Sequence, residues 1–347
     1  MKSVTRFIGC LLLIASYSTL ANQTSFTLLY GSCLHQDKPQ PIWNAINREP
    51  GDVFMLLGDN IYGDSEDPDV LAAKYKKQWQ VEGFATQRQR MPLIGIWDDH
   101  DFGVNDGGKE YPSKEASRQL MLDYFNEAKD SARRTRADGI YTSYVYGEAP
   151  HRVQIILPDL RWNRDAINHV SKVEYLAQKA PKNMGPYLPT TESGATMLGE
   201  KQWQWLEQQL QVPAEVRIIG SSLQLLPEFT GWEAWANFPA DRQRLMDLLD
   251  KYQVNNLVIL SGDTHWGELS KITRKNGQSL YEMTSSGLTE TWHDVSPNQH
   301  RISKSFAHAN YGVVKIDWLE HPAITLTLKD VNGSDVFSQV IPLPVKP

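Results

Sequence analysis

Four short motifs in this chain carry acids, histidines and a cysteine, and each motif directly follows an apolar run. They are Gly31-Ser32-Cys33, Gly58-Asp59-Asn60-Ile61-Tyr62, Trp97-Asp98-Asp99-His100-Asp101 and Ser261-Gly262-Asp263-Thr264-His265. Neighbouring carboxylates repel one another unless cations neutralise them, and Asp, His, Cys and Tyr are metal-binding side chains. The pattern therefore predicts a metal site and favours one with two ions. Two-metal sites are typical of phosphate-ester hydrolysis.

The elements that must bring these motifs together are four buried strands. The apolar runs 26–30, 53–57, 93–96 and 257–260 are too short for helices. Residues at the carboxyl ends of strands in an α/β sheet converge on one crevice. Helices are expected near 41–47, 70–79, 115–127, 200–210 and 242–252, and a run of strands follows residue 268. This order predicts an α/β fold with two packed sheets and helices outside.

The bulk composition predicts a folded and secreted protein. The 347 residues are 41% hydrophobic and carry a net charge of −6, which disfavours specific nucleic-acid binding. Residues 1–21 have the basic start, apolar centre and small-residue end of a secretory signal peptide. The apolar run is shorter than the ~20 residues of a membrane span, so no transmembrane anchor is expected. We expect cleavage after Ala21, a single domain over 22–347, and a secreted or periplasmic location.

The first two motifs supply three candidate metal ligands. Once Cys10 leaves with the signal, Cys33 has no intramolecular disulfide partner, and it is either a buried small hydrophobe or a metal thiolate. We favour the thiolate. Asp59 could cap a turn, but Gly58 lets the backbone turn tightly enough for Asp59 to bridge two cations about 3.5–4 Å apart. Tyr62 is either a core residue or a phenolate ligand.

The remaining motifs supply acids, a proton donor and possible substrate contacts. His100, among Asp98, Asp99 and Asp101, is a metal ligand or a general acid for the leaving oxygen. Asp263 and His265 can each reach a metal. Arg161 and Arg164 could clamp a phosphate or form structural ion pairs. Asn60, Asp98 and Asp101 could be further ligands or supports, and the segment Trp232–Trp235 with Trp292 and His293 could line the pocket or fill the core.

Taken together, these motifs resemble the alkaline phosphatase D type (PhoD-like) of metallophosphoesterases over residues 26–287. Further motifs shared with that family are Asp159-Leu-Arg161-Trp-Asn-Arg164-Asp165, residues 198–206 and Thr284-Ser-Ser-Gly287. The resemblance implies a four-layer α/β/β/α sandwich. It implies that Asp59 bridges the metals, that Cys33, Tyr62 and His265 complete one site, and that Asp99 and Asp263 belong to the other. The β-rich N-terminal domain of longer relatives is expected to be missing.

The resemblance also implies a cofactor and a reaction. The cofactor would be two or more metal ions, Fe³⁺ at the thiolate and phenolate site and Ca²⁺ at the oxygen-rich site, with other divalent ions as alternatives. The expected reaction is hydrolysis of phosphate monoesters or diesters by in-line attack of a metal-bound hydroxide, with His100 as the acid. The alternatives are a phosphodiesterase or phospholipase D-like enzyme acting on lipid or polymer diesters, and a non-catalytic metal- or phosphate-binding protein.

Overall fold

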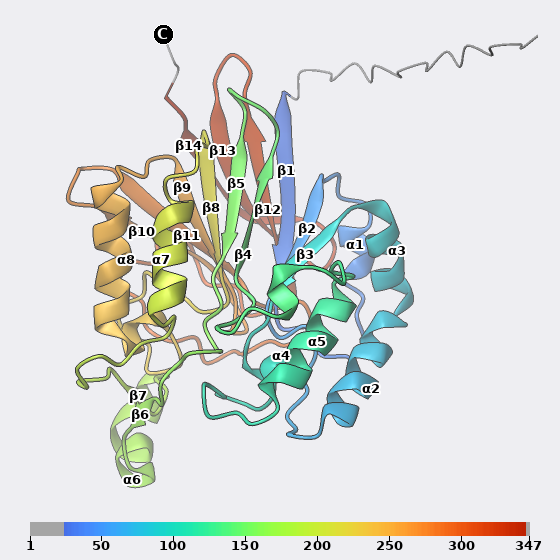
Figure 1. Ribbon diagram of the computed structural model, residues 1–347. Coiled ribbons are helices and arrows are strands. Elements are labelled where there is room, and N and C mark those ends of the chain that lie inside the picture. Colours follow the sequence, from blue (N-terminus) through green and yellow to red (C-terminus); the bar gives the residue numbers. More distant parts are fainter. Residues whose placement is uncertain (1–23, 345–347) are drawn as a thin grey trace, which may run out of the picture.

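The computed structural model describes residues 24–344, so the expected signal peptide lies outside the described residues. Two six-stranded sheets pack face to face, and helices cover both outer faces (Figure 1). This is the four-layer α/β/β/α sandwich that the sequence predicted. No helix within residues 24–344 combines the length and apolar character that crossing a bilayer requires.

The first sheet places three of the four motifs at one edge. Its strands run in the order β14 (Asp335–Pro342), β13 (Ala323–Asp330), β12 (Asn310–Asp317), β1 (Ser25–Gly31), β2 (Val53–Leu57) and β3 (Leu93–Ile96). β1, β2 and β3 are parallel, with Leu28 opposite Val53 and Phe54 opposite Leu93. The carboxyl ends of these three strands therefore meet at the same edge.

The second sheet supplies the fourth motif. Its order is β10 (Gly267–Thr273), β11 (Ser279–Ser285), β9 (Leu257–Ser261), β8 (Val216–Ser221), β5 (Val153–Leu157) and β4 (Thr142–Tyr146). The C-terminal strand run is thus divided, with β10 and β11 here and β12 to β14 in the first sheet. The sheets touch closely at Gly220 of β8, where an added Cβ would lie 2.8 Å from Leu57 of β2.

Two layers of helices bury the outer faces. The first sheet is covered by α1 (Trp43–Ile46), α2 (Pro68–Trp79), α3 (Glu82–Arg90) and α5 (Lys114–Tyr124), and the second by α7 (Glu200–Gln209) and α8 (Pro239–Lys251). Trp43 packs on Phe54 of β2 and on Phe84 of α3. On the other side, Trp203 and Leu245 belong to a second core. The sequence did not predict α3, because most of its residues are polar.

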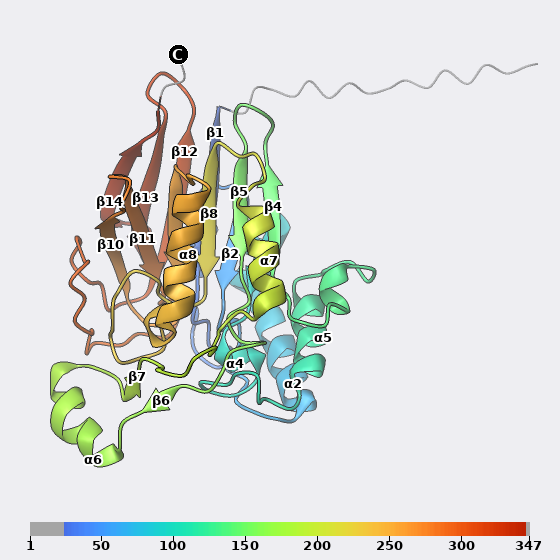
Figure 2. The same ribbon diagram turned by 60° about the vertical axis from the view of Figure 1, so that its left-hand side comes forward.

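One excursion separates β5 from α7. It contains β6 (Asn168–His169), α6 (Lys172–Glu174), a π-helix (Tyr175–Lys179), a 3-10 turn (Ala180–Lys182) and β7 (Tyr187–Leu188). Figure 2 shows it projecting from the lower end of the molecule. Backbone bonds from Gly185 to Thr230 and from Tyr187 to Gly231 dock its second half onto the loop that follows β8.

Candidate metal centre

The turn after β2 places Asp59 at the centre of the site. Gly58 has a φ of +91°, and a Cβ there would lie 2.4 Å from the Cβ of Asp98, so this position requires glycine. Asp59 follows with a φ of +50° and donates its backbone N–H to Asp101 Oδ1 at 3.1 Å. The turns after β2 and β3 are therefore packed against each other and fixed by a side chain.

Cys33, Tyr62 and His265, the three residues that the resemblance assigns to one site, lie around Asp59. Cys33 Sγ and the Tyr62 hydroxyl lie 3.4 and 3.3 Å from Asp59 Oδ2. The Tyr62 hydroxyl also lies 3.0 Å from His265 Nε2. Donor atoms of Cys33, Asp59 and His265 all lie within 4.8 Å of one another, close enough to share one ion. These donors come from the ends of β1, β2 and β9.

A second group of donors consists of oxygens and one imidazole. Asp59, Asp99 and His100 form one such set, and Asp98, Asp99 and Asp263 form another, each within 4.8 Å. Asp59 belongs to both this group and the first one, as a bridging ligand would. Three buried oxygens here, Asp59 Oδ1, Asp98 Oδ2 and Asp99 Oδ1, have no hydrogen-bond partner among the described residues. Buried carboxylate oxygens need a partner, so these residues fit cations.

The backbone is strained at four of these residues. Cys33, Asp59, Asp263 and His265 have φ values of +63°, +50°, +70° and +64°. Residues other than glycine rarely adopt this left-handed conformation, and it costs of the order of 1 kcal/mol or more each. Such strain persists where the surrounding structure fixes a functional geometry. Its concentration at residues chosen from the sequence as ligands supports a functional role for them.

Asp101 and Asn60 connect the turns after β2 and β3. Asp101 Oδ1 accepts the backbone N–H of Asp98 at 2.7 Å, in addition to that of Asp59, and its Oδ2 accepts from the Asn60 side chain. Asn60 also donates to the carbonyl of Ile96, the last residue of β3, at 3.0 Å. For Asp101 the geometry favours the supporting role, whereas Asn60 combines support with a buried Oδ1 that has no hydrogen-bond partner among the described residues and is open to a cation.

Burial and repulsion between neighbouring acids shift the pKa values of the site residues. Burial and the neighbouring acids raise the pKa of Asp59 and Asp263 well above the usual range. Burial, opposed by Arg161, raises the pKa of Asp98 to about 6. Burial lowers the pKa of His265 to about 4, so its imidazole is neutral and available as a ligand. Without cations, this cluster cannot hold all of its carboxylates ionised.

His100 is the charged histidine of the site. It is the second residue of α4 (Asp99–Phe102), and its Nδ1 lies 2.7 Å from Asp64 Oδ1. Although burial opposes the charged form, Asp99, Asp59 and Asp64 raise the pKa of His100 to about 11. The bond to Asp64 orients the ring and leaves Nε2 free for another partner. His100 thus presents a charged imidazole close to Asp59.

The two arginines lie behind the acids and not at the pocket surface. Arg161 is 0% exposed, and its guanidinium contacts Asp98 and Glu233 at 2.6 Å each. Arg164 is 1% exposed and donates to the backbone oxygen of Asp106. The expected contact between one arginine and the substrate has no support in this arrangement. The structural ion pair, which the sequence left open, accounts for Arg161.

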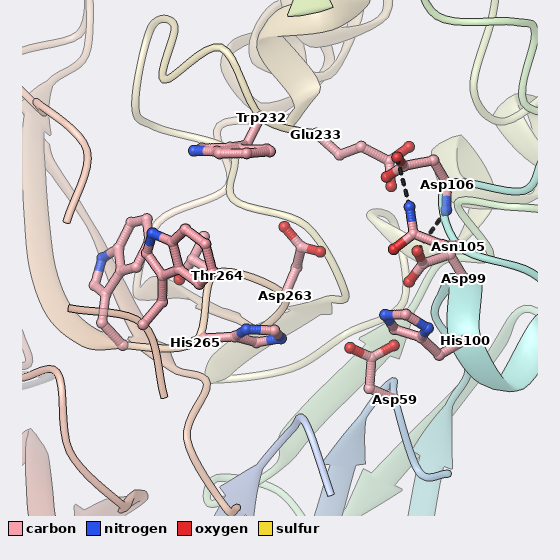
Figure 3. Close-up of a pocket in the computed structure, with 12 residues that line it drawn as sticks. Asp59, Asp99, His100, Asn105, Asp106, Trp232, Glu233, Asp263, Thr264 and His265 are labelled. Carbon is pink, nitrogen blue, oxygen red and sulfur yellow. Dashed lines mark hydrogen bonds between the residues drawn. The ribbon is translucent and has the colours of Figure 1, made fainter. Parts of the chain in front are cut away.

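A pocket of about 250 Å³ opens onto the acids. Its lining residues are Asp59, Asp99, His100, Asn105, Asp106, Trp232, Glu233, Asp263, Thr264, His265, Trp266 and Trp292 (Figure 3). Trp292 therefore lines the pocket, as expected. His293 does not line it; its ring contacts that of His308 instead.

Sequence reasoning missed Asp106 and Glu233. Together with Asp99 they form a further set of oxygens within 4.8 Å of one another, and Glu233 is buried. Burial and the charges of Glu233 and Asp99 raise the pKa of Asp106 to about 8. The sequence does contain a signal for Glu233, because it is the one acid in the segment 232–235, but that segment was interpreted from its aromatic residues alone. This set could hold a further cation beside the two main groups.

Comparisons with known proteins identify a family and a shared fold. A family model described as PhoD-like phosphatase matches residues 28–320. Alkaline phosphatase D of Bacillus subtilis (strain 168) is 26% identical over 199 residues, which are 50% of this chain and 31% of that protein. The match thus spans about a third of the length of that curated relative.

Two solved structures share the fold. A structure of PhoD matches 93% of this chain and 69% of its own, with a TM-score of 0.70 and 15% identity. A structure of GAP50, the anchor in the inner membrane complex of Plasmodium, matches 93% of this chain and 90% of its own, with a TM-score of 0.58 and 12% identity. At these identities the likeness shows a common architecture.

Proposed function

The chain belongs to the PhoD-like phosphatase family, and from this premise we propose that it is a metal-dependent hydrolase of phosphate esters. One observation carries the proposal: Asp59 belongs to a donor set with Cys33 and His265, and it also lies within 4.8 Å of Asp99, which belongs to an oxygen set with Asp98 and Asp263. A shared carboxylate between two donor sets is the arrangement of a two-metal centre.

The donor types support different ions at the two positions. Cys33, Tyr62 and His265 offer sulfur, phenolate and nitrogen, which suit a transition ion, and we assign Fe³⁺ to this position. Asp98, Asp99 and Asp263 offer only oxygens, which suit Ca²⁺. When bound, the ions would lower the pKa of a water molecule and neutralise charge on the phosphoryl oxygens, as required for in-line attack.

The protein's own groups would handle the proton and the orientation. Protonated His100, oriented through Nδ1 by Asp64, would give the proton on Nε2 to the leaving oxygen. Arg161 would keep Asp98 and Glu233 in place from behind the pocket and would not touch the substrate. Trp232 and Trp292 would exclude water on the other side of the pocket.

The substrate and the location are also part of the proposal. We propose a phosphate monoester or diester as the substrate, and a lipid or polymer diester of the phospholipase D-like kind is the alternative. A purely metal- or phosphate-binding protein is disfavoured because it would not need a charged histidine beside the bridging acid. The signal-like residues 1–21 support a secreted or periplasmic enzyme.

Hydrolysis of p-nitrophenyl phosphate and bis-p-nitrophenyl phosphate tests the proposal. The mature protein is assayed at mildly alkaline pH with iron and calcium, with and without a chelator. We expect chelator-sensitive turnover that Asp59→Ala abolishes, whereas Asp130→Ala, which removes an exposed carboxylate, leaves it unchanged. A folded Asp59→Ala variant with full activity would contradict the proposal. The faster of the two substrates distinguishes a phosphatase from a diesterase.

A further inference from the structure

The pocket has two chemically different walls. One wall carries the acids and His100, and the other carries Trp232, Trp266 and Trp292. In Figure 3, Asp263 lies between Trp232 and the pair Asp99 and His100. The metal chemistry proposed above uses the first wall and assigns no partner to the second.

Two tryptophans of the second wall form an edge-to-face pair. The ring centroids of Trp232 and Trp292 are 6.3 Å apart, with an angle of 73° between the planes. Trp292 is 45% exposed although it lines the pocket. A large aromatic ring left open to solvent inside a pocket is a surface that ligands bury.

Both tryptophans are connected to the structure around them. The backbone N–H of Trp292 donates to the carbonyl of His265 at 2.9 Å, so the backbone that carries this ring is fixed beside a proposed metal ligand. Trp232 packs against the excursion, since a Cβ at Gly185 would lie 2.5 Å from its ring. Gly185 itself donates its N–H to the carbonyl of Thr230 at 3.2 Å. The aromatic wall is therefore pre-organised relative to the metal centre.

We propose that Trp232 and Trp292 form a subsite for the ester's alcohol component and that this subsite selects a planar aromatic ring. The inference rests on the proposed function, because the phosphate is placed on the acidic wall. An aromatic ring attached to that phosphate can extend toward the tryptophans and stack on them or meet their edges. Aliphatic alcohols and sugars lack the π-face that these rings match best. Aryl esters and nucleotides share the required chemistry.

Binding of non-hydrolysable phosphonates tests the subsite without turnover. Phenylphosphonate and methylphosphonate are titrated by calorimetry into the metal-loaded mature protein. We expect phenylphosphonate to bind roughly three- to tenfold more tightly. Trp292→Ala should remove this preference, and Trp292→Phe should restore part of it. Trp79→Ala, which removes a 37% exposed tryptophan of α2 outside the pocket, should preserve the preference.

The outcomes separate the subsite from the proposed function. Equal affinities of the wild type for the two phosphonates, or a preference that survives in Trp292→Ala, would overturn the subsite. A tryptophan-dependent preference without hydrolysis of any ester would support the subsite and contradict the hydrolase. The phosphonate analogue of adenosine monophosphate distinguishes nucleotides from aryl esters, because a ribose separates its aromatic ring from the phosphorus. Tighter binding than phenylphosphonate indicates a nucleotide, and weaker binding indicates an aryl ester.

Discussion

The hydroxyl oxygen of Ser286 lies 3.1 Å from the sulfur of Cys33. The same oxygen accepts the backbone N–H of His265 at 2.8 Å, which leaves the hydroxyl proton for the sulfur. Burial and Asp59 raise the pKa of the Cys33 thiol, and the hydrogen bond from Ser286 acts in the opposite direction. One side chain beyond β11 thus links proposed ligands from the ends of two different sheets.

Replacing this serine should weaken metal binding without unfolding the protein. In Ser286→Ala, a thiolate at Cys33 loses a hydrogen-bond donor and the His265 turn loses its acceptor. Loss of such a supporting contact typically lowers metal affinity by about 10–100-fold. Chelator competition monitored by bound iron measures the change. Ser285→Ala is the matched control, because its hydroxyl bonds Asn310 instead. Equal iron affinity in both variants would contradict the prediction.

The strands could be predicted because their information is local, whereas the grouping of the first donor set was implied by the family resemblance. A short apolar run followed by Gly-Asp or Gly-Ser-Cys specifies a buried strand and the turn after it, and β2 and β3 match their predicted ranges. Parallel strands then bring their carboxyl ends together, which places Asp59 and Asp99 side by side. The excursion and α3 carry no comparable apolar pattern.

The surroundings of the arginines depended on contacts between distant segments. Arg161 meets Asp98 and Glu233, which are 63 and 72 residues away in the chain. A sequence pattern shows that an arginine follows a buried strand, but it does not show whether the guanidinium faces an acid or the solvent. The packing of the loop after β8 decided this question, and that loop also contributes Glu233 and Trp232.

Removing Arg161 should destabilise the protein more than it affects substrate affinity. Arg161→Ala leaves the buried carboxylates of Asp98 and Glu233 without their cation, which typically costs about 3–5 kcal/mol. Urea unfolding at fixed metal concentration measures this loss. Lys129→Ala removes an exposed ion pair with Asp123 and should cost less than about 1 kcal/mol. Unchanged stability with a raised KM would instead indicate that Arg161 contacts the substrate.

The stabilisation that metal ions provide should increase with pH. Burial raises the pKa of Asp59 and Asp263, that of Asp98 to about 6 and that of Asp101 to about 7. Because these values lie above about 3.9 for an unfolded Asp, the metal-free protein loses stability as pH rises from about 4 to about 7. His265 opposes this trend, since burial lowers its pKa to about 4 and the folded protein then binds fewer protons than the unfolded chain in this range. Asp99, whose pKa Arg161 and His100 lower against the effect of burial, adds its stabilisation at lower pH.

Metal binding becomes stronger as pH rises, because the ligands must be deprotonated. We therefore expect a chelator to lower the Tm at pH 8 by roughly 5 °C more than at pH 5. Thermal unfolding of metal-loaded and chelated protein across this range checks the sign. A chelator effect of the same size at both pH values would show that these acids do not hold the ions.

Asp64 should set the alkaline limit of activity through His100. The histidine must hold its proton in order to donate it, so activity falls as pH rises through its pKa. When cations neutralise Asp59 and Asp99, Asp64 remains the acid that favours protonated His100, at 2.7 Å. Asp64→Asn keeps an oxygen for the hydrogen bond but removes the charge. We expect the alkaline limb of the kcat profile to move to lower pH by about one unit.

The choice of substrate makes this prediction specific. Phenyl phosphate has a poor leaving group and needs the proton, whereas p-nitrophenyl phosphate needs it less, so the shift should be larger with phenyl phosphate. Glu66→Gln removes an exposed charge two residues away and is the control for a general field effect. If both variants keep the wild-type profile with phenyl phosphate, another group protonates the leaving oxygen and His100 is a ligand only.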